Sequence, residues 1–284
     1  MKPKKYFITF SNKNFLSQSR RAIIMAKFLG KFDFVESFSK SDIDESFYNE
    51  NKKILDQVRG AGYWLWKPYF INKVLSNLNF GDYLFYCDSG VVFLKNIDNL
   101  IFELENIGQD IMGFELPLIE EQWSKKELFI NLNCENDESM LMSNQIMASF
   151  ILIKKSEFSV NFFSELMDLS KNVINITDIQ TIKQSELLIE HRHDQSIFSI
   201  LYKKKHLIPF KDPSQYGEMP QLYLGKKDIH FKYNNLDKAG IYLFRINKYQ
   251  AKYSNVLFHY RKSNLYKSLS VYFFKKILNF NKKC

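Results

Sequence analysis

The sequence has few cysteines, and their number and spacing exclude several protein classes. Only 3 of the 284 residues are cysteine, namely Cys87, Cys134 and Cys284. An odd number without regular spacing argues against a disulfide framework and a zinc cluster, and it is typical of a reducing cytoplasm. No internal repeat or low-complexity linker interrupts residues 5–259. We therefore predict one domain, residues 1–260, followed by a C-terminal tail, residues 261–284.

Long hydrophobic runs are also missing. The longest uninterrupted apolar runs, such as Tyr83–Cys87, have five residues, and Phe150–Ile153 has four, far below the roughly 20 residues that a membrane-spanning helix needs. The N-terminal segment MKPKKYFITFSNKN starts with basic residues, but its apolar run has five residues, too few for a signal peptide. We expect a soluble, cytoplasmic protein that contacts membranes only at their surface.

The positive charge is concentrated in the tail. Of the net charge of +9, residues 261–284 contribute seven through Lys and Arg and contain no acid. A nucleic-acid binder would spread basic residues over its folded surface, so we expect no nucleic-acid partner. On a helical wheel the tail has one apolar face, formed by Leu265, Leu269, Tyr272, Phe273, Ile277 and Phe280. This pattern predicts peripheral contact with the anionic inner face of the cytoplasmic membrane. The alternative is a helix docked on the domain itself.

The predicted elements of the N-terminal segment follow the strand-helix-strand order with which a nucleotide-binding half of an α/β domain begins. A strand at Lys5–Phe10, a helix at Phe15–Leu29 and a second strand at Phe32–Val35 follow one another. The loop after Phe10 would then face the base of a nucleotide. There is no G-x-G-x-x-G motif and no Walker A lysine loop, so neither NAD binding nor P-loop hydrolysis is supported.

The clearest pattern lies between Arg59 and Phe93. An aromatic turn with glycines leads into a helix predicted at Tyr69–Leu78, with Pro68 at its start. The apolar run Tyr83–Cys87 then predicts a buried strand of a mostly parallel sheet. Asp88-Ser89-Gly90 ends this run. An acid at the carboxyl end of such a strand stands where open α/β sheets bind ligands, although all three are also ordinary turn residues.

Three segments of this sequence carry a resemblance to a known group of enzymes. GAGYWLWKP (residues 60–68) followed by GDYLFYCDSG (residues 81–90) resembles bacterial glycosyltransferases of capsule and lipopolysaccharide biosynthesis with the GT-A fold. HRHDQSIF (residues 191–198) is similar to the second acidic motif of their retaining, family-8-like branch, in which an Asp-Gln pair faces the sugar. The resemblance extends over roughly residues 5–261.

The resemblance implies a fold and an activity. The fold would be a Rossmann-like, mixed and mostly parallel α/β sheet flanked by helices. The activity would be transfer of a hexose from a nucleotide-sugar, UDP-linked, to a glycan or lipid-linked acceptor. Retention and inversion of the anomeric centre both remain open.

It also implies roles for particular residues. Asp194 and Gln195 would be catalytic, and the donor would contact Lys67, Arg59, Asp88, Ser89 and His193. Mn²⁺ or Mg²⁺ would be held by Asp88 and His259, with His230 as a weaker candidate. Gln145 and Ser149 are weaker candidates near the sugar. The family motif is Asp-x-Asp, whereas Gly90 occupies its third position here, so one expected metal ligand is missing.

Other interpretations of the same residues exist. Asp194 could serve only as a helix N-cap, and Lys67 and Arg59 could be solvated charges at helix ends. Tyr63, Trp64 and Trp66 are predicted to pack in the core, with the two tryptophans on one side. A metal-dependent phosphoesterase or nuclease would use His191, His193, Asp194 and Asp88. A third alternative is a non-catalytic, sugar-binding relative of the fold.

Overall fold

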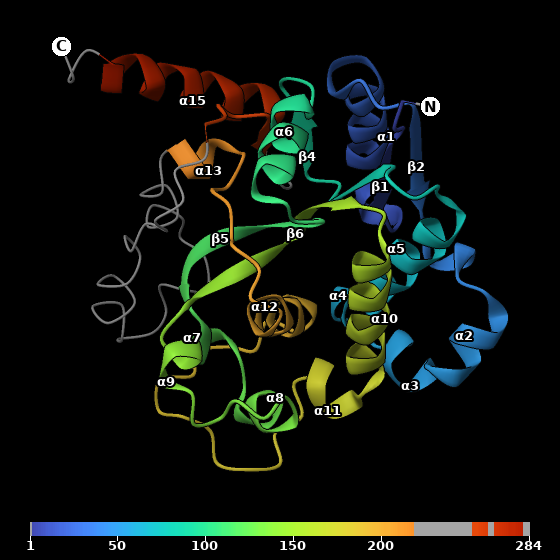
Figure 1. The fold of residues 1–284 in the computed structure, drawn as a ribbon, viewed down its shortest axis with the longest axis vertical. Coiled ribbons are helices and arrows are strands. Elements are labelled where there is room, and N and C mark those ends of the chain that lie inside the picture. Colours follow the sequence, from blue (N-terminus) through green and yellow to red (C-terminus); the bar gives the residue numbers. More distant parts are fainter. Residues whose placement is uncertain (1, 219–251, 261–263, 281–284) are drawn as a thin grey trace.

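The protein is built on a five-stranded sheet (Figure 1). The computed structural model describes residues 2–218, 252–260 and 264–280, with side chains up to residue 274. The strand order is β2-β1-β3-β6-β5, with β1 parallel to β2 and β3, and β6 antiparallel to both its neighbours. The bounds are β1 Lys5–Phe10, β2 Phe34–Phe38, β3 Tyr83–Cys87, β5 Ile111–Ile119 and β6 Asn144–Lys154. This mixed, mostly parallel sheet confirms the predicted α/β class.

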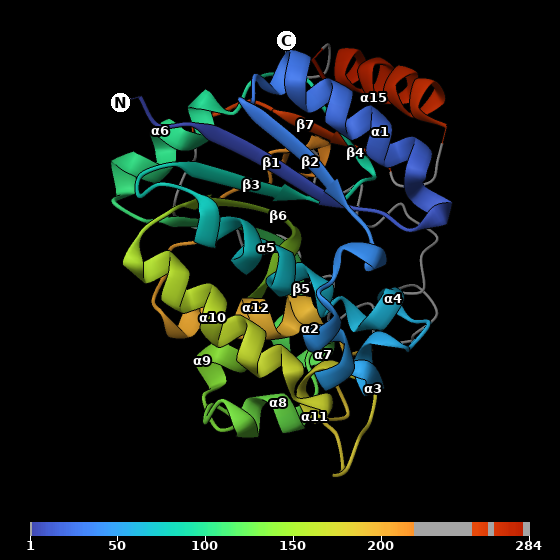
Figure 2. The ribbon, with the colours of Figure 1, turned by 90° about the vertical axis from the view of Figure 1, so that its right-hand side faces the viewer.

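Helices cover both faces of the sheet (Figures 1 and 2). Alternate residues of β3 point to opposite faces: Leu84 and Tyr86 join the core under α5, α10 and α12, whereas Phe85 and Cys87 join the core under α1 and α6. The longer helices are α1 Leu16–Met25, α5 Trp66–Asn77, α6 Asp98–Ile107, α10 Glu157–Lys171 and α12 Asp194–Lys204. The short ones are α2 Glu45–Glu50, α3 Lys52–Leu55, α4 Gly60–Tyr63, α7 Glu120–Trp123, α8 Lys126–Asn131, α9 Glu138–Leu141, α11 Val173–Ile176 and α13 Gln215–Glu218.

Several predicted boundaries shift in the structure. Strand β2 starts two residues late because it is an edge strand whose length follows its pairing with β1, from Tyr6↔Phe34 to Phe10↔Phe38. The helix predicted from residue 15 becomes α1 and a π-helical turn, Ala26–Gly30. Helix α5 begins at Trp66, so Pro68 is its third residue, still within the first turn, where the proline removes no helical hydrogen bond.

A second, two-stranded sheet corrects one prediction. The apolar segment after Asp88-Ser89-Gly90, Val91–Phe93 (β4), would by sequence alone be expected to continue the main sheet, but it pairs antiparallel with β7, Leu257–His259. In this register Val91 lies opposite His259. The pairing therefore brings a residue from near the C-terminus beside the chain that leaves Asp88.

The C-terminal helix α15, Leu265–Phe280, docks on the domain through one face. Tyr272 is buried; its hydroxyl donates to Glu218 (2.8 Å) and accepts from the amide of Asn255 (2.8 Å). On its other sides the helix exposes three aromatic side chains, Tyr266, Phe273 and Phe274. Among the described residues, no helix combines the length and apolar character needed to cross a membrane.

Candidate active site

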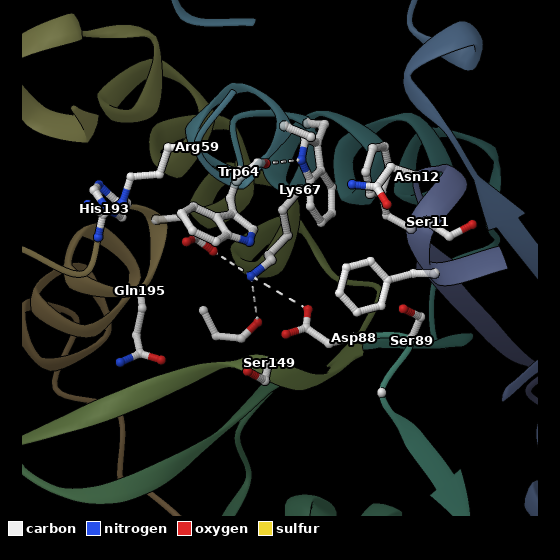
Figure 3. Close-up of a pocket in the computed structure, with 18 of the residues that line it drawn as sticks. Ser11, Asn12, Arg59, Trp64, Lys67, Asp88, Ser89, Ser149, His193 and Gln195 are labelled. Carbon is white, nitrogen blue, oxygen red and sulfur yellow. Dashed lines mark hydrogen bonds and ion pairs between the residues drawn. The ribbon is translucent and has the colours of Figure 1, made fainter. Parts of the chain in front are cut away.

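A cleft of about 760 Å³ opens at the carboxyl ends of β1 and β3 (Figure 3). All eight residues assigned from the sequence line it, namely Arg59, Lys67, Asp88, Ser89, His193, Asp194, Gln195 and His259. The weaker candidate Ser149 lines it too, whereas His230 lies outside the described residues. The loop after β1 forms one end with Ser11, Asn12 and Asn14. Six separate parts of the chain thus meet at one place in the fold.

The wall between α3 and α5 is a left-handed turn. Residues 60–64 all have positive φ angles, 59°, 54°, 103°, 49° and 61° in order, and three of them are not glycine. For L-residues this conformation costs about 1–2 kcal/mol each, and such strain persists where surrounding structure enforces it. The indole of Trp66 donates to the carbonyl of Gly60 (2.9 Å) and thereby ties the turn to α5.

The two tryptophans line the same cleft and pack with the same core, but their rings stack on different partners. Trp66 is buried and stacks on Phe10, with ring centroids 3.7 Å apart. Trp64 lines the cleft and stacks on His193, with centroids 5.3 Å apart. The predicted shared side assumed an extended segment, whereas residues 60–64 form a left-handed turn, and Trp64 is half-buried at the edge of the core.

Lys67 occupies the middle of the site and is only 5% exposed. Its Nζ lies 2.5 Å from Asp194 Oδ2, 3.0 Å from the carbonyl of Ala148 and 4.0 Å from Asp88 Oδ1 (Figure 3). A buried lysine between two carboxylates is not a solvated charge at a helix end. One fixed cation therefore connects the two acidic motifs of the sequence.

Asp194 is the first residue of α12, and His193 rather than Asp194 holds the N-cap position. The N-cap interpretation assumed that the helix starts at Gln195. Burial raises the pKa of Asp194 to about 6, while the Lys67 ammonium opposes this rise. His193 itself has the strained angles φ 54° and ψ −120°, and these turn the chain so that the next side chain reaches Lys67.

Asp88 lies at the end of β3 with part of its carboxylate facing the cleft. Its N–H donates to the carbonyl of Ser149 (2.9 Å), and its Oδ1 accepts from the Tyr86 hydroxyl (2.6 Å). Its side chain keeps 34% exposure, compared with 9% for Asp194. Asp88 is thus held by backbone and tyrosine yet remains accessible to a ligand.

The possible metal-ligating residues of the cleft suit a cation that is also bound by a substrate. Within the described residues, no group of three acidic, histidine or cysteine side chains could hold a metal by itself. Asp88 and His259 offer one oxygen and one nitrogen donor in the same cleft. Mg²⁺ commonly uses one or two protein ligands together with substrate phosphates and water. The two residues therefore fit a metal that arrives with a diphosphate.

Arg59 belongs to the wall opposite Asp88. Its guanidinium lies 3.3 Å from Asp178 and also contacts Glu190. Asp178 in turn accepts from the hydroxyl of Tyr63 (2.9 Å). Two acids already match the charge of Arg59 and fix it beside Trp64.

The two histidines of the HRHD segment face backbone carbonyls. His191 Nε2 lies 2.8 Å from the carbonyl of Asn175, and His193 Nδ1 lies 2.8 Å from that of Ile176. Burial lowers the pKa of His191 well below its usual value and that of His193 to about 4, so both rings are neutral at pH 7. The phosphoesterase alternative needs these side chains clustered with acids on a metal, and their contacts do not favour it.

Sequence reasoning named Gln195 and Gln145 but missed the buried acid behind them, Glu120. Gln195 Nε2 donates to Gln145 Oε1 (2.8 Å), and Gln145 Nε2 donates to Glu120 Oε1 (2.9 Å). Glu120 follows β5 and is fully buried. No local pattern marks such an acid, because its partners lie far away in the sequence.

Comparison with known proteins identifies the fold. No protein-family model and no curated protein matches the chain in sequence. Mouse xyloside xylosyltransferase 1 in its apo form is similar in structure, with a TM-score of 0.51, 10% identity, and coverage of 93% of this chain and 98% of that chain. The galactosyltransferase LgtC with donor and acceptor sugar analogues gives a TM-score of 0.46, 13% identity, and coverage of 90% and 86%. The bifunctional glycosyltransferase WbbM gives 0.49, 12% identity, and coverage of 93% and 47%. The chain has the α/β fold of GT-A glycosyltransferases.

Proposed function

We propose that the chain is a glycosyltransferase that moves a sugar from a nucleotide-diphosphate donor to a glycan or lipid-linked acceptor. The observation that carries the proposal is Lys67, buried between Asp194 and Asp88 in the cleft at the carboxyl ends of β1 and β3. Ligands of open α/β sheets bind at this edge. The fold of the structural neighbours and the three sequence segments support the same assignment.

Each part of the cleft matches one part of such a donor. The nucleoside would lie over Ser11 and Asn12 at the end of β1, and the diphosphate beside Asp88 and Ser89. The transferred sugar would then meet Asp194, Gln195 and Lys67. A cleft of about 760 Å³ is within the range of small-molecule sites.

The chemistry requires positive charge near the leaving diphosphate. Breaking the bond between the sugar C1 and the diphosphate leaves negative charge on phosphate oxygens and an oxocarbenium-like sugar, and fixed charges that face them lower the barrier. Lys67 supplies one such charge without reorganisation, because Asp194 and the carbonyl of Ala148 hold it. Mn²⁺ or Mg²⁺ held by Asp88 and His259 would add a second positive charge at the phosphates.

The wall around Trp64 fits the acceptor better than the diphosphate. Arg59 is paired with Asp178 and Glu190, so we assign it to the wall that holds Trp64 and His193. An indole at the rim offers a flat apolar surface for a sugar ring. We propose a surface polysaccharide precursor as the acceptor and a hexose as the transferred sugar, as in the retaining, family-8-like enzymes that the sequence resembles.

Binding of nucleotides tests the proposal most directly. UDP or GDP should raise the melting temperature of the protein, more with Mn²⁺ than with EDTA. Asp88→Asn should weaken binding about tenfold with Mn²⁺ and much less with EDTA, because a charged ligand is lost at a site that backbone contacts keep folded. The measurement is titration calorimetry, with Asp98→Asn on the surface of α6 as the control.

Each result has a definite meaning. Equal Mn²⁺-dependent binding by Asp88→Asn and wild type would remove Asp88 from the metal site. Nucleotide-sugar binding without turnover of any donor would favour the non-catalytic relative of the fold. No binding of any nucleotide would reject the proposal.

We also propose that α15 contacts anionic membranes through its exposed aromatics. Replacing both Phe273 and Phe274 by Glu should abolish sedimentation with vesicles containing phosphatidylserine, since it removes apolar insertion and adds negative charge. Tyr272 stays docked, so donor hydrolysis should be unaffected. The control is Phe80→Glu, an exposed aromatic outside α15. Unchanged sedimentation of the double variant would leave the helix as part of the domain's own packing.

A further inference from the structure

Gln195 is the outer end of a chain of buried contacts that leads away from the cleft. Its Nε2 donates to Gln145 Oε1 (2.8 Å), and Gln145 Nε2 donates to Glu120 Oε1 (2.9 Å). Gln145 lies in β6 and Glu120 in α7, and both are 0% exposed. We call Glu120, Gln145 and Gln195 the amide relay.

The direction of the amide relay is set by Glu120. A carboxylate only accepts hydrogen bonds, and the other oxygen of Glu120 already accepts from Lys203 Nζ and Ser199 Oγ, each at 2.5 Å. Gln145 Nε2 lies near a second pure acceptor, the carbonyl of Trp123 (3.3 Å). Gln145 must therefore point its NH₂ group at Glu120 and the carbonyl of Trp123, and its own carbonyl at Gln195.

The orientation of Gln195 follows from this. It can meet the carbonyl of Gln145 only with its own NH₂ group, so its carbonyl oxygen is left for the cleft. In Figure 3 this oxygen lies on the side of Ser149 and Lys67. If Gln145 were reversed, Gln195 would instead present NH₂ to the cleft.

We propose that Glu120 is a positioning residue that selects which end of the Gln195 amide faces the reacting sugar. This inference rests on the proposed function, in which the transferred sugar meets Gln195, and it places the amide of Gln195 at the anomeric carbon. Positive charge develops on that carbon as the diphosphate leaves. A carbonyl dipole pointing its oxygen at the charge lowers the barrier, whereas an NH₂ group raises it. Glu120 acts here without touching the substrate.

The variant Glu120→Gln should reverse the amide relay. Lys203 and Ser199 would keep the carbonyl of the new glutamine, so its NH₂ group would face Gln145. Gln145 would turn to accept from it and give up the weaker contact of its Nε2 with the carbonyl of Trp123 (3.3 Å), so this variant should also melt at a lower temperature. Gln195 would then present NH₂ to the cleft. We expect kcat to fall about 100-fold, comparable to the loss of one oriented dipole at a reacting centre, with the KM for the donor little changed.

A second substitution, at Gln195, should restore the hydrogen bond between residues 145 and 195 after Gln145 has turned. In Gln195→Glu alone, a carboxylate opposes the carbonyl of Gln145, so two acceptors meet and the melting temperature should fall. In the double variant Glu120→Gln/Gln195→Glu, the turned Gln145 donates to the new carboxylate. The double variant should melt above the value expected from adding the two single effects, and its kcat should exceed that of Glu120→Gln.

The control is Ser199→Ala in the same buried cluster. It removes a hydrogen bond to Glu120 and one from Ile146 N–H but leaves the direction of Gln145 unchanged, so it should lower the melting temperature and not kcat. Unchanged kcat in Glu120→Gln, or strictly additive melting temperatures, would overturn the proposal. The melting cycle needs no turnover. If the wild-type chain transfers no sugar, the proposed function therefore fails, but the melting temperatures still show whether Glu120 sets the orientation of Gln145 and Gln195.

Discussion

Replacing Asp194 by alanine should lower turnover by two or more orders of magnitude and also lower stability by more than the loss of a helix cap, because Lys67 stays buried with its remaining carboxylate, Asp88, 4.0 Å away. The carboxylate holds Lys67 at 2.5 Å, and a misplaced reacting group costs about 100-fold in rate. The matched control is Asp137→Ala, which removes an acid that caps α9 by accepting from the Met140 N–H (3.1 Å). That variant should lose about 1 kcal/mol of stability and keep its turnover. If the two variants behave alike in both measurements, Asp194 has only a structural role.

The pH dependence of the rate and of the stability tests the role of the Asp194 carboxylate independently. Because burial raises the pKa of Asp194 to about 6, the wild-type rate should fall as pH drops through about 6. Stability should change in the other direction. A folded-state pKa above the unfolded one means that protonation favours the folded state, so this group adds stability as pH falls through 6 and loses it as pH rises. The residual rate of the Asp194→Ala variant should lack this acidic limb.

Replacing Lys67 by methionine should abolish transfer and also destabilise the fold. The substitution leaves the Asp194 carboxylate buried without its cation, and breaking a buried ion pair costs about 3–5 kcal/mol. The loss should be largest at pH 7 and smaller near pH 5, where Asp194 takes up a proton. Chemical denaturation at the two pH values and a donor turnover assay measure both effects.

A second buried lysine, Lys155, offers a control variant that separates the loss of stability from the loss of turnover. Lys155 is 8% exposed and donates to the carbonyl of Leu78 (2.6 Å), with no carboxylate partner among its described contacts. Lys155→Met should lower stability and leave turnover intact. Normal turnover in Lys67→Met would show that the central cation is structural.

Local patterns predicted the elements that carry the site, and they did so for physical reasons. The strand Tyr83–Cys87 is buried on both faces, so its apolar run is continuous and ends sharply at Asp88. The strand Lys5–Phe10 was also predicted with the bounds that β1 has, because an apolar run followed by polar turn residues is a local signal.

Features that depend on distant contacts could not be predicted. β4 carries no signal that it leaves the main sheet, because its partner β7 lies more than 150 residues later. The ion pair of Lys203 with Glu120 and the position of Lys67 between two acids arise from packing of separate elements. The resemblance named Asp88 and Asp194 separately, and only the fold shows the lysine between them.

The left-handed turn at residues 60–64 restricts which sequences can encode this wall. A β-carbon on Gly60 would lie 2.3 Å from the ring of Trp64, and one on Gly62 would lie 2.8 Å from the Cα of Leu55. A side chain in place of Gly62 would therefore collide with backbone, and one in place of Gly60 would have to displace the Trp64 ring, while the residue between them, Ala61, already has a side chain. The sequence Gly-Ala-Gly followed by two aromatic residues is thus what allows the backbone to form this left-handed turn. A sequence that lacks it must build the rim of the cleft in another way, even when the rest of the fold is the same.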